Sequence, residues 1–261
     1  MIFNSENLPS RTLPYRVKEF ELELFKPRQL ALLSKSVMLD SLEPALEATS
    51  QVLKGIDVEE LTVGDFFYLL TYQRFHCFKR RPVTAEWTCP GVVFHAIGSH
   101  ETYSPGDIDR IVNDWENADE QQRAELQDPE TISLEGDVCG HVNYGTVAFE
   151  DFNVLYLPED LKLDSRLDYP RCNTLVEFIE MQRDPDVGML ADACQWIKEG
   201  RTLKNRLDFL LESDDTELME IASEACRDIK HGIVRTLGKR CSRCNHKHTL
   251  TFTVDPKAFF L

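Results

Sequence analysis

The segment KRCSRCNHKHTLTFTVDPKAFFL, residues 239–261, decides how the fold of this chain is interpreted. Cys241 and Cys244 stand two residues apart in a basic turn, between the strand-like sequence VRTLG and the alternating run TLTFTV. A thioredoxin-type dithiol lies at the start of a helix, whereas a predicted strand follows this pair. Two thiolates in a turn between strands are typical of a zinc knuckle, which is half of a tetrahedral site.

The other half is predicted from a cysteine pair that a long insertion splits. Cys89 with Pro90 follows the strand-like VTAEWT, and Cys139 with Gly140 precedes the strand-like HVNYGTVAF. Glycine after the second thiolate suits a turn that wraps a metal, because such a turn needs a positive φ or a close backbone approach. An iron–sulfur cluster on the same thiolates is the alternative to zinc. We therefore predict that one structural Zn²⁺ has four thiolate ligands, Cys89, Cys139, Cys241 and Cys244.

The chain has eight cysteines, so four remain outside this set. Cys172, Cys194 and Cys226 fall in or beside predicted helices, where free cysteine behaves as a small buried hydrophobe, and Cys77 is ambiguous. His246 or His248 is an alternative ligand in place of one cysteine, and His141 lies near the first pair. The competing hypothesis is that Cys89 and Cys139 are merely buried and that the other pair is a reactive surface dithiol.

Residues 101–137 are strongly acidic. They carry twelve acidic and two basic side chains, which accounts for −10 of the net charge of −16. Ser104-Pro105 is typical of a helix start, and we predict an exposed helix that runs towards Gln127. Such a segment is either a solvated excursion or a docking surface for a basic partner.

The pattern of elements predicts an α+β protein. Residues 83–89, 139–153 and 234–254 are expected to form a zinc-ribbon-like β module, split by the acidic insertion and by a helical insertion over residues 161–233. We expect a helix to begin at Pro27, and another after Thr62, with Asp65 completing an approximate capping box. Phe66, Leu69, Leu70 and Phe75 of that helix are predicted to face a core. The expected organisation is an N-terminal α+β segment (1–82), the first knuckle with its strands (83–153), a helical region (154–233) and the C-terminal knuckle (234–261).

No catalytic motif is recognisable in the sequence, so we expect the chain not to be an enzyme. It lacks a Gly-rich phosphate loop, a Gly-x-Ser-x-Gly elbow and a His-Glu-x-x-His pair. No run approaches the roughly 20 apolar residues of a membrane span, and no signal peptide is evident, so we expect a cytoplasmic product. The charge of −16 disfavours non-specific binding to DNA.

Several short motifs, taken in order, resemble a known family. The sequence is similar to the baseplate hub subunit and hub assembly proteins of contractile-tailed, T-even-like bacteriophages. Those proteins tend to show an LP…YR segment, an LT…D…LL…R helix, a CP…CG knuckle, further helices, and a C-terminal C..C knuckle with a strand ending in DP…FF. The matching positions are Leu13-Pro14-Tyr15-Arg16, Leu61-Thr62, Asp65, Leu69-Leu70, Arg74, Cys89-Pro90, Cys139-Gly140, Cys241, Cys244, Asp255-Pro256 and Phe259-Phe260.

The resemblance implies a late, structural or assembly protein of the tail baseplate. It covers most of the chain, and the sequence departs from it in the long insertion between Cys89 and Cys139 and in Ser242 and Asn245 of the second knuckle. The implied partners are other tail and baseplate hub proteins, with no small-molecule substrate. The implied location is the host cytoplasm during assembly and the virion baseplate if the subunit is retained.

Two other functions remain as alternatives. Basic residues precede the first ligand (Lys79, Arg80 and Arg81) and surround the second pair (Lys239, Arg240, Arg243 and Lys247). They are compatible with a zinc ribbon that binds nucleic acid, or they simply offset the charge of four thiolates on Zn²⁺. A redox dithiol at Cys241 and Cys244 is the other alternative.

Overall fold

The chain folds into two units that each carry helices and strands. The computed structural model describes residues 1–11, 13–78, 82–96, 102–123, 125–126, 128–129, 134–213 and 215–252. Among these, unit 1 comprises Met1–Arg81 and Phe149–Arg235, and unit 2 comprises Pro82–Ala148 and Thr236–Phe252. The mixture of helices and strands confirms the predicted α+β class.

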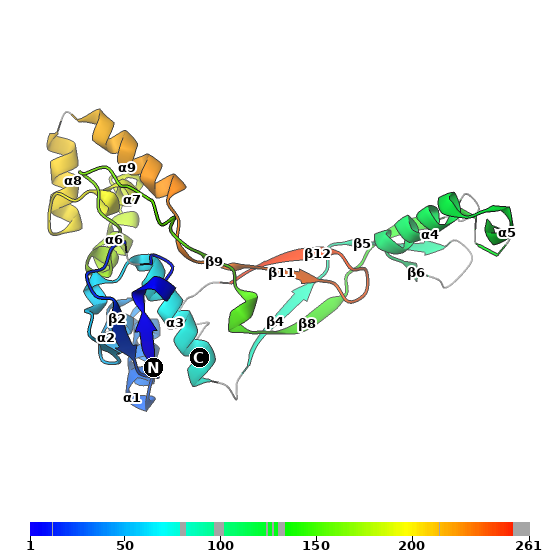
Figure 1. Ribbon diagram of the computed structural model, residues 1–261, viewed down its shortest axis with the longest axis horizontal. Helices are drawn as coiled ribbons and strands as arrows, with labels where there is room; N and C mark the ends of the chain where they lie inside the picture. The colour runs from blue at the N-terminus through cyan, green and yellow to red at the C-terminus, as the bar shows by residue number, and fades with distance from the viewer. Residues whose placement is uncertain are drawn as a thin grey trace. The chain divides into compact units, whose positions relative to one another are not determined.

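The N-terminal part of unit 1 combines three helices with a small antiparallel sheet (Figure 1). The sheet has the order β1-β2-β3, and Phe3 of β1 stands opposite Phe20 of β2. Helix α1 begins at Pro27 as predicted, because proline at the first helical position lacks only an N–H that has no helical partner there. The elements are β1 (Ile2–Asn4), β2 (Glu19–Leu22), α1 (Pro27–Leu39), α2 (Glu43–Ser50), β3 (Leu53–Lys54) and α3 (Val63–Cys77), with 3₁₀ turns at Ser5–Asn7 and Val58–Glu60.

Helix α3 supplies the centre of this first core. Phe66, Leu69 and Leu70 are at most 1% exposed, and Phe75 is partly buried against the same cluster. All four positions were predicted to face a core. Full burial of such a side chain stabilises a fold by about 1.5–3 kcal/mol relative to exposure, so this helix holds the N-terminal elements together.

The start of α3 is capped by Thr62, whose Oγ1 accepts a hydrogen bond from the Asp65 N–H at 3.2 Å. The Asp65 carboxylate does not complete the predicted capping box. It accepts hydrogen bonds instead from the Ser10 N–H at 3.0 Å and from the hydroxyls of Ser10 and Tyr15. The Tyr15 hydroxyl also accepts a bond from the Thr62 N–H at 3.0 Å. A fully buried carboxylate therefore ties the N-terminal segment to α3.

The second part of unit 1 contains four helices and a short ladder. Leu157, Ile197, Leu203 and Leu218 are at most 2% exposed and form its core. Helical structure begins only at Cys172, later than the predicted residue 161, and Pro170 disfavours helical conformation in the residue before it. The elements are β9 (Val154–Leu155), α6 (Leu175–Gln182), α7 (Gly188–Trp196), α8 (Leu203–Glu212), α9 (Thr216–Asp228) and β10 (Gly232–Ile233), with 3₁₀ turns at Phe149–Asp151 and Cys172–Thr174.

Unit 2 is built from paired strands. β4 pairs with β8, and beyond Cys89 and Cys139 the two chain segments pair again as β5 and β7. β11 and β12 form a separate antiparallel hairpin. The elements are β4 (Val83–Thr88), β5 (Val92–Ala96), β6 (Thr102–Tyr103), α4 (Pro105–Asn117), α5 (Glu120–Arg123), β7 (Leu134–Val138), β8 (Val142–Val147), β11 (Thr236–Arg240) and β12 (Lys247–Thr251).

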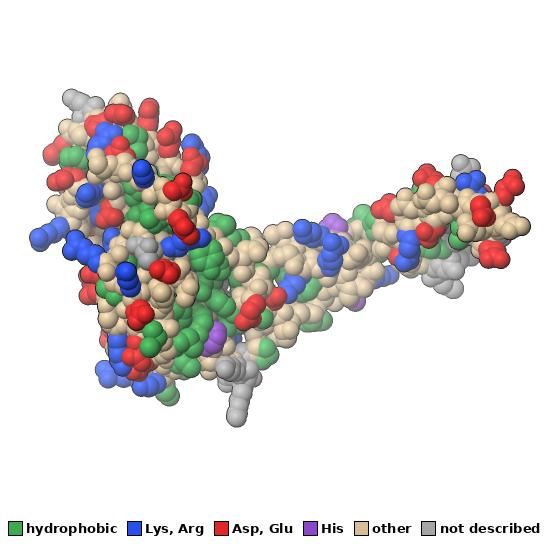
Figure 2. All heavy atoms as spheres, viewed as in Figure 1, with side chains coloured by type: hydrophobic (Ala, Val, Ile, Leu, Met, Phe, Trp, Pro, Cys, Tyr) green, Lys and Arg blue, Asp and Glu red, His purple; other side chains and the backbone are tan. Residues whose placement is uncertain are grey.

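The described part of the acidic insertion contains two α-helices where one was predicted. Ser104 and Asp107 form a capping box at the start of α4. This helix ends at Asn117 because Ala118 is extended, and Asp119 then accepts a hydrogen bond from the Gln122 N–H at 2.8 Å at the start of α5. No residue of either helix is buried, and Figure 2 shows acidic side chains on their surface.

Some predicted features lie outside the described residues. They include the end of the acidic helix at Gln127, the basic run Lys79, Arg80 and Arg81, and the C-terminal residues from 253 onward with the DP…FF ending. Within the described ranges, no helix combines the length and the apolar character that crossing a membrane requires.

Candidate metal centre

The first knuckle forms where the β4–β8 ladder passes into the β5–β7 ladder. The Cys89 N–H donates a hydrogen bond to the His141 carbonyl at 2.9 Å, and the Gly140 N–H donates to the Cys89 carbonyl at 3.0 Å. The Cys139 N–H donates to the Gly91 carbonyl at 2.7 Å. These backbone bonds fix the two cysteines side by side, although a long insertion separates them in sequence.

The second knuckle is the turn between β11 and β12. The Cys241 N–H donates to the His246 carbonyl at 2.9 Å, and the Asn245 N–H donates to the Cys241 carbonyl at 3.0 Å. Asn245 has a φ of 56°, and Gly140 in the first knuckle has a φ of 58°. The predicted need for positive φ after the second thiolate is confirmed at Gly140. In the second knuckle asparagine takes this conformation, which it tolerates better than most residues.

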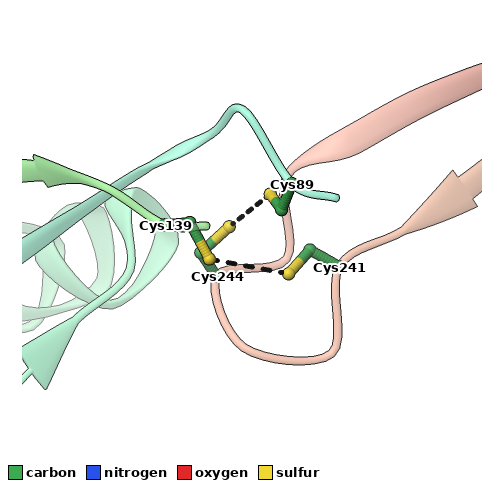
Figure 3. Close-up of side chains that lie close together, drawn as sticks. All are labelled: Cys89, Cys139, Cys241 and Cys244. Carbon is green, nitrogen blue, oxygen red and sulfur yellow. Dashed lines mark hydrogen bonds between the residues drawn. The ribbon is translucent and has the colours of Figure 1, made fainter. Parts of the chain in front are cut away.

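The two knuckles bring all four predicted cysteines together (Figure 3). The Sγ atoms of Cys89 and Cys244 are 3.4 Å apart, and those of Cys139 and Cys241 are 3.8 Å apart. All four sulfur atoms lie within 4.8 Å of one another, and no cysteine of the group is more than 4% exposed. Four zinc–thiolate bonds of about 2.3 Å in a tetrahedron place neighbouring sulfurs about 3.8 Å apart. The cluster is therefore compatible with a metal site.

Gly91 allows the knuckles to approach this closely. A Cβ at this position would lie 2.6 Å from the His246 Cβ and 3.1 Å from the Cys244 Sγ. The Gly91 N–H also donates to the Cys89 Sγ at 3.3 Å. Any larger residue here would push the second knuckle away from the first.

Burial and hydrogen bonds shift the pKa values of Cys241 and Cys89 in opposite directions. Burial raises the pKa of Cys241, but backbone N–H groups of its own turn and the Asn143 side chain outweigh burial and lower this pKa to about 6. The Arg243 N–H lies 3.4 Å and the Asn143 Nδ2 3.5 Å from that sulfur. Burial dominates at Cys89 and raises its pKa to about 12. Without a cation, the cluster holds thiolate character at Cys241 and resists it at Cys89.

The histidines considered as replacement ligands surround the cluster without joining it. His248 is 8% exposed, and its Nε2 lies 3.1 Å from the Cys89 Sγ, within hydrogen-bonding distance. His141 Nε2 lies 3.0 Å from the Ser242 hydroxyl, and the His246 ring packs edge-on against the His248 ring. The group of potential metal ligands consists of the four cysteines alone among the described residues.

The other cysteines lie away from this group. Cys172 and Cys194 are at most 2% exposed in the two cores of unit 1, and Cys77 and Cys226 are partly buried there. Burial raises the pKa of all four thiols, which keeps them protonated at neutral pH. Cys172, Cys194 and Cys226 match the expectation of small buried hydrophobes, and Cys77, which the sequence left ambiguous, is a partly buried thiol of the first core.

The basic residues of the second knuckle bond to the knuckles themselves. Arg243 donates to the Cys139 carbonyl at 3.3 Å, and Arg240 donates to the Asn245 carbonyl at 3.4 Å. These contacts agree with charge compensation around the cysteines. They leave less of the two guanidinium groups available for phosphates.

Asn143 is the functional residue that sequence reasoning missed. It is 4% exposed, and its Oδ1 accepts hydrogen bonds from the Ser242 N–H at 2.9 Å and the Ser242 hydroxyl at 3.1 Å. It therefore links β8 to the second knuckle as well as contacting the Cys241 sulfur. The sequence did carry a signal for Asn143. It lies between Val142 and Tyr144 on β8, and neighbouring side chains of a strand point to opposite faces.

No known family model, curated protein or solved structure matches this chain.

Proposed function

We propose that the chain is a structural or assembly component of a bacteriophage tail baseplate hub, and that one structural zinc ion stabilises it. The observation that carries the proposal is the convergence of four buried cysteine sulfurs from two distant turns. The motif order that resembles baseplate hub proteins supplies the biological context. The protein acts through contacts with other tail proteins, in the host cytoplasm during assembly and in the virion baseplate if it is retained.

The module that we propose is zinc-ribbon-like. The β11–β12 hairpin carries one knuckle, and the β4–β8 pair with its β5–β7 continuation carries the other. Of the residues that the structure describes, the buried apolar cluster at this site comprises Val93 and the four cysteines. A module with so few buried aliphatic side chains needs another source of stability, and structural zinc supplies apparent binding free energies of about 10 kcal/mol or more.

The geometry favours a single ion over an iron–sulfur cluster. The largest separation among the four sulfurs is within 4.8 Å, which suits four ligands on one ion. A cluster inserts several iron and sulfide atoms between its thiolates and needs more space than this. Four thiolates also leave zinc no open position for water, so the site is structural rather than catalytic.

Two motifs of the resemblance meet in unit 1 and give further support. Tyr15 belongs to the LP…YR segment, and Thr62 and Asp65 belong to the LT…D helix. Their side chains and backbone form the buried network that joins the N-terminal segment to α3. These positions therefore have a physical reason to occur together in a family of related folds.

Metal analysis tests the zinc, and mass spectrometry tests the context. Protein purified without added metal is expected to contain about one zinc ion per chain and no visible colour. A coloured protein with iron would overturn the assignment of zinc. Peptides of this chain in purified virions would identify a retained subunit, and their presence only in tail-assembly intermediates would identify an assembly factor. Absence from both fractions would overturn the baseplate proposal while leaving the metal site intact.

A further inference from the structure

Unit 1 contains a cavity of about 340 Å³ that shares no residue with the cysteine cluster. It lies where the N-terminal end of α3, the β9–β10 ladder and the C-terminal end of α7 meet. Its size falls at the lower end of the range for small-ligand sites. Apolar side chains that make up much of its wall are Val63, Phe67, Leu155, Trp196, Ile229 and Ile233.

Two glycines hold one wall of the cavity in place. Gly64, in the first turn of α3, lies against His231, and a Cβ on Gly64 would approach the His231 carbonyl oxygen to 2.7 Å. Gly232 has a φ of 108°, and its Cβ position lies 3.0 Å from the Gly64 Cα. The backbone of Gly232 thus packs directly on the backbone of Gly64. The first turn of the 15-residue helix α3 borders the cavity.

The charged side chains of the lining are cations. Lys230 and Arg235 line the cavity, and no aspartate or glutamate belongs to its described wall. The Arg235 guanidinium stacks on the Phe67 ring at 4.9 Å. Desolvation by burial lowers the pKa of Arg235. In a chain with a net charge of −16, this local excess of positive charge favours an anionic occupant.

Gln195 adds a hydrogen-bond donor without a partner. It lines the cavity and is only 7% exposed, yet its Nε2 has no acceptor among the residues that the structure describes. The backbone carbonyl of Gln195, in contrast, accepts a hydrogen bond from the Arg206 guanidinium at 2.9 Å. A buried amide N–H that lacks an acceptor is unfavourable, and a bound ligand with a carbonyl group would supply the missing acceptor.

We infer that this cavity binds the C-terminal residue of a partner polypeptide. Such a residue combines the three features that the wall requires: an apolar side chain, a carbonyl oxygen for the Gln195 amide and a free carboxylate for Arg235. The inference goes beyond the baseplate proposal, since neither zinc nor any tail protein enters the argument.

The test compares matched ligands on the full-length protein by isothermal titration calorimetry. N-acetyl-phenylalanine carries all three features, and N-acetyl-phenylalaninamide lacks only the charge. The acid is expected to bind at least about tenfold more tightly than the amide, since hydrogen bonds to charged groups are the stronger ones. This comparison needs no variant. Equal affinities, or no binding of the acid at about 10 mM, would overturn the inference.

Two variants separate the roles of the side chains. Arg235→Gln is expected to weaken binding of the acid by about tenfold and to leave the amide unaffected. Gln195→Met removes the unpartnered donor, and it is expected to weaken binding of the acid and binding of the amide by the same factor. Arg201→Gln, an exposed arginine outside the lining, is the matched control and should change neither affinity. If Arg235→Gln folds and binds the acid as the unaltered protein does, the inference fails.

Discussion

The Sγ atom of Cys89 lies 3.4 Å from the Sγ atom of Cys244, although 155 positions separate the two residues in the chain. The same two knuckles bring Cys139 to within 3.8 Å of Cys241. Each sulfur contact joins one knuckle to the other, and among the residues that the structure describes, the buried cluster around them contains Val93 besides the cysteines. An ion bound here would therefore hold the two knuckles together where these described residues bury little aliphatic surface.

The first prediction is that Cys244→Ser removes the metal and unfolds the strands of unit 2. Serine offers zinc a poor ligand, and the remaining thiolates no longer close a tetrahedral site. The loss of a structural zinc amounts to about 10 kcal/mol of apparent binding free energy, more than a small module retains. Zinc content measured by plasma mass spectrometry should fall from about one ion per chain to a small fraction. Limited proteolysis should then cut within β11 and β12.

Cys226→Ser is the matched control for this experiment. Cys226 is a partly buried thiol of unit 1 that lies outside the cysteine cluster. Its zinc content and its proteolysis pattern should equal those of the unaltered protein. If Cys244→Ser kept its full zinc content, the four-thiolate assignment would be wrong.

The second prediction uses two glycines at equivalent helix positions. A Cβ on Gly64 in α3 would lie 2.6 Å from the His231 Cδ2 and 2.7 Å from the His231 carbonyl oxygen, and a backbone atom has little freedom to move. A Cβ on Gly106 in α4 would meet only the Ser104 Oγ at 3.8 Å. Gly64→Ala should therefore destabilise the protein by about 1–3 kcal/mol, whereas Gly106→Ala should be neutral or stabilise by up to about 1 kcal/mol. Urea unfolding of the two variants measures the sign of each change in stability. Equal changes would show that α3 does not pack tightly against His231 at Gly64.

The sequence indicated which four cysteines cluster at the candidate site because each knuckle carries a local signal. Cys241 and Cys244 stand between alternating strands, and Gly140 marks a turn with positive φ. The hydrogen bonds to the sulfurs were not predicted, because they depend on strand register. His248 shares a strand face with Leu250, so its burial was available from the two-residue period.

The carboxylate of Asp65 shows the same limit within unit 1. Its spacing from Thr62 fits a capping box, but Ser10 and Tyr15 provide three donors from more than 45 positions earlier in the chain. These tertiary hydrogen bonds take the place of the capping-box bond that the local spacing predicts. The pairing of β5 with β7 was not predicted, for a similar reason. The acidic insertion separates these two short strands in the sequence, so neither strand indicates its partner locally.

The third prediction concerns the buried carboxylate. Asp65→Asn replaces an acceptor-only group by an amide whose NH₂ faces existing donors, so the protein should lose about 1.5–3 kcal/mol of stability. Tyr15→Phe removes one donor to Asp65 and also the acceptor of the Thr62 N–H. Urea unfolding of both single variants and the double variant should give a coupling energy of about 1 kcal/mol or more. Additive effects would show that the Tyr15–Asp65 contact contributes little.

The fourth prediction concerns acid sensitivity through His231. Burial lowers the pKa of this histidine below its ordinary 6.5, and the charge of Asp65 opposes burial only in part. Its Nε2 lies 2.7 Å from the Thr62 Oγ1. Since the unfolded chain binds the proton more tightly than the folded chain, His231 contributes stability that is full above pH 6.5 and is lost as the pH falls towards the folded pKa.

Urea unfolding at pH 7.5 and pH 5.5 measures this contribution. The unaltered protein should lose stability at the lower pH, and His231→Gln should lose less, because glutamine does not titrate. An identical loss in His231→Gln would show that the acid sensitivity arises from other groups, and that the His231 ring accepts a proton without disturbing the first turn of α3.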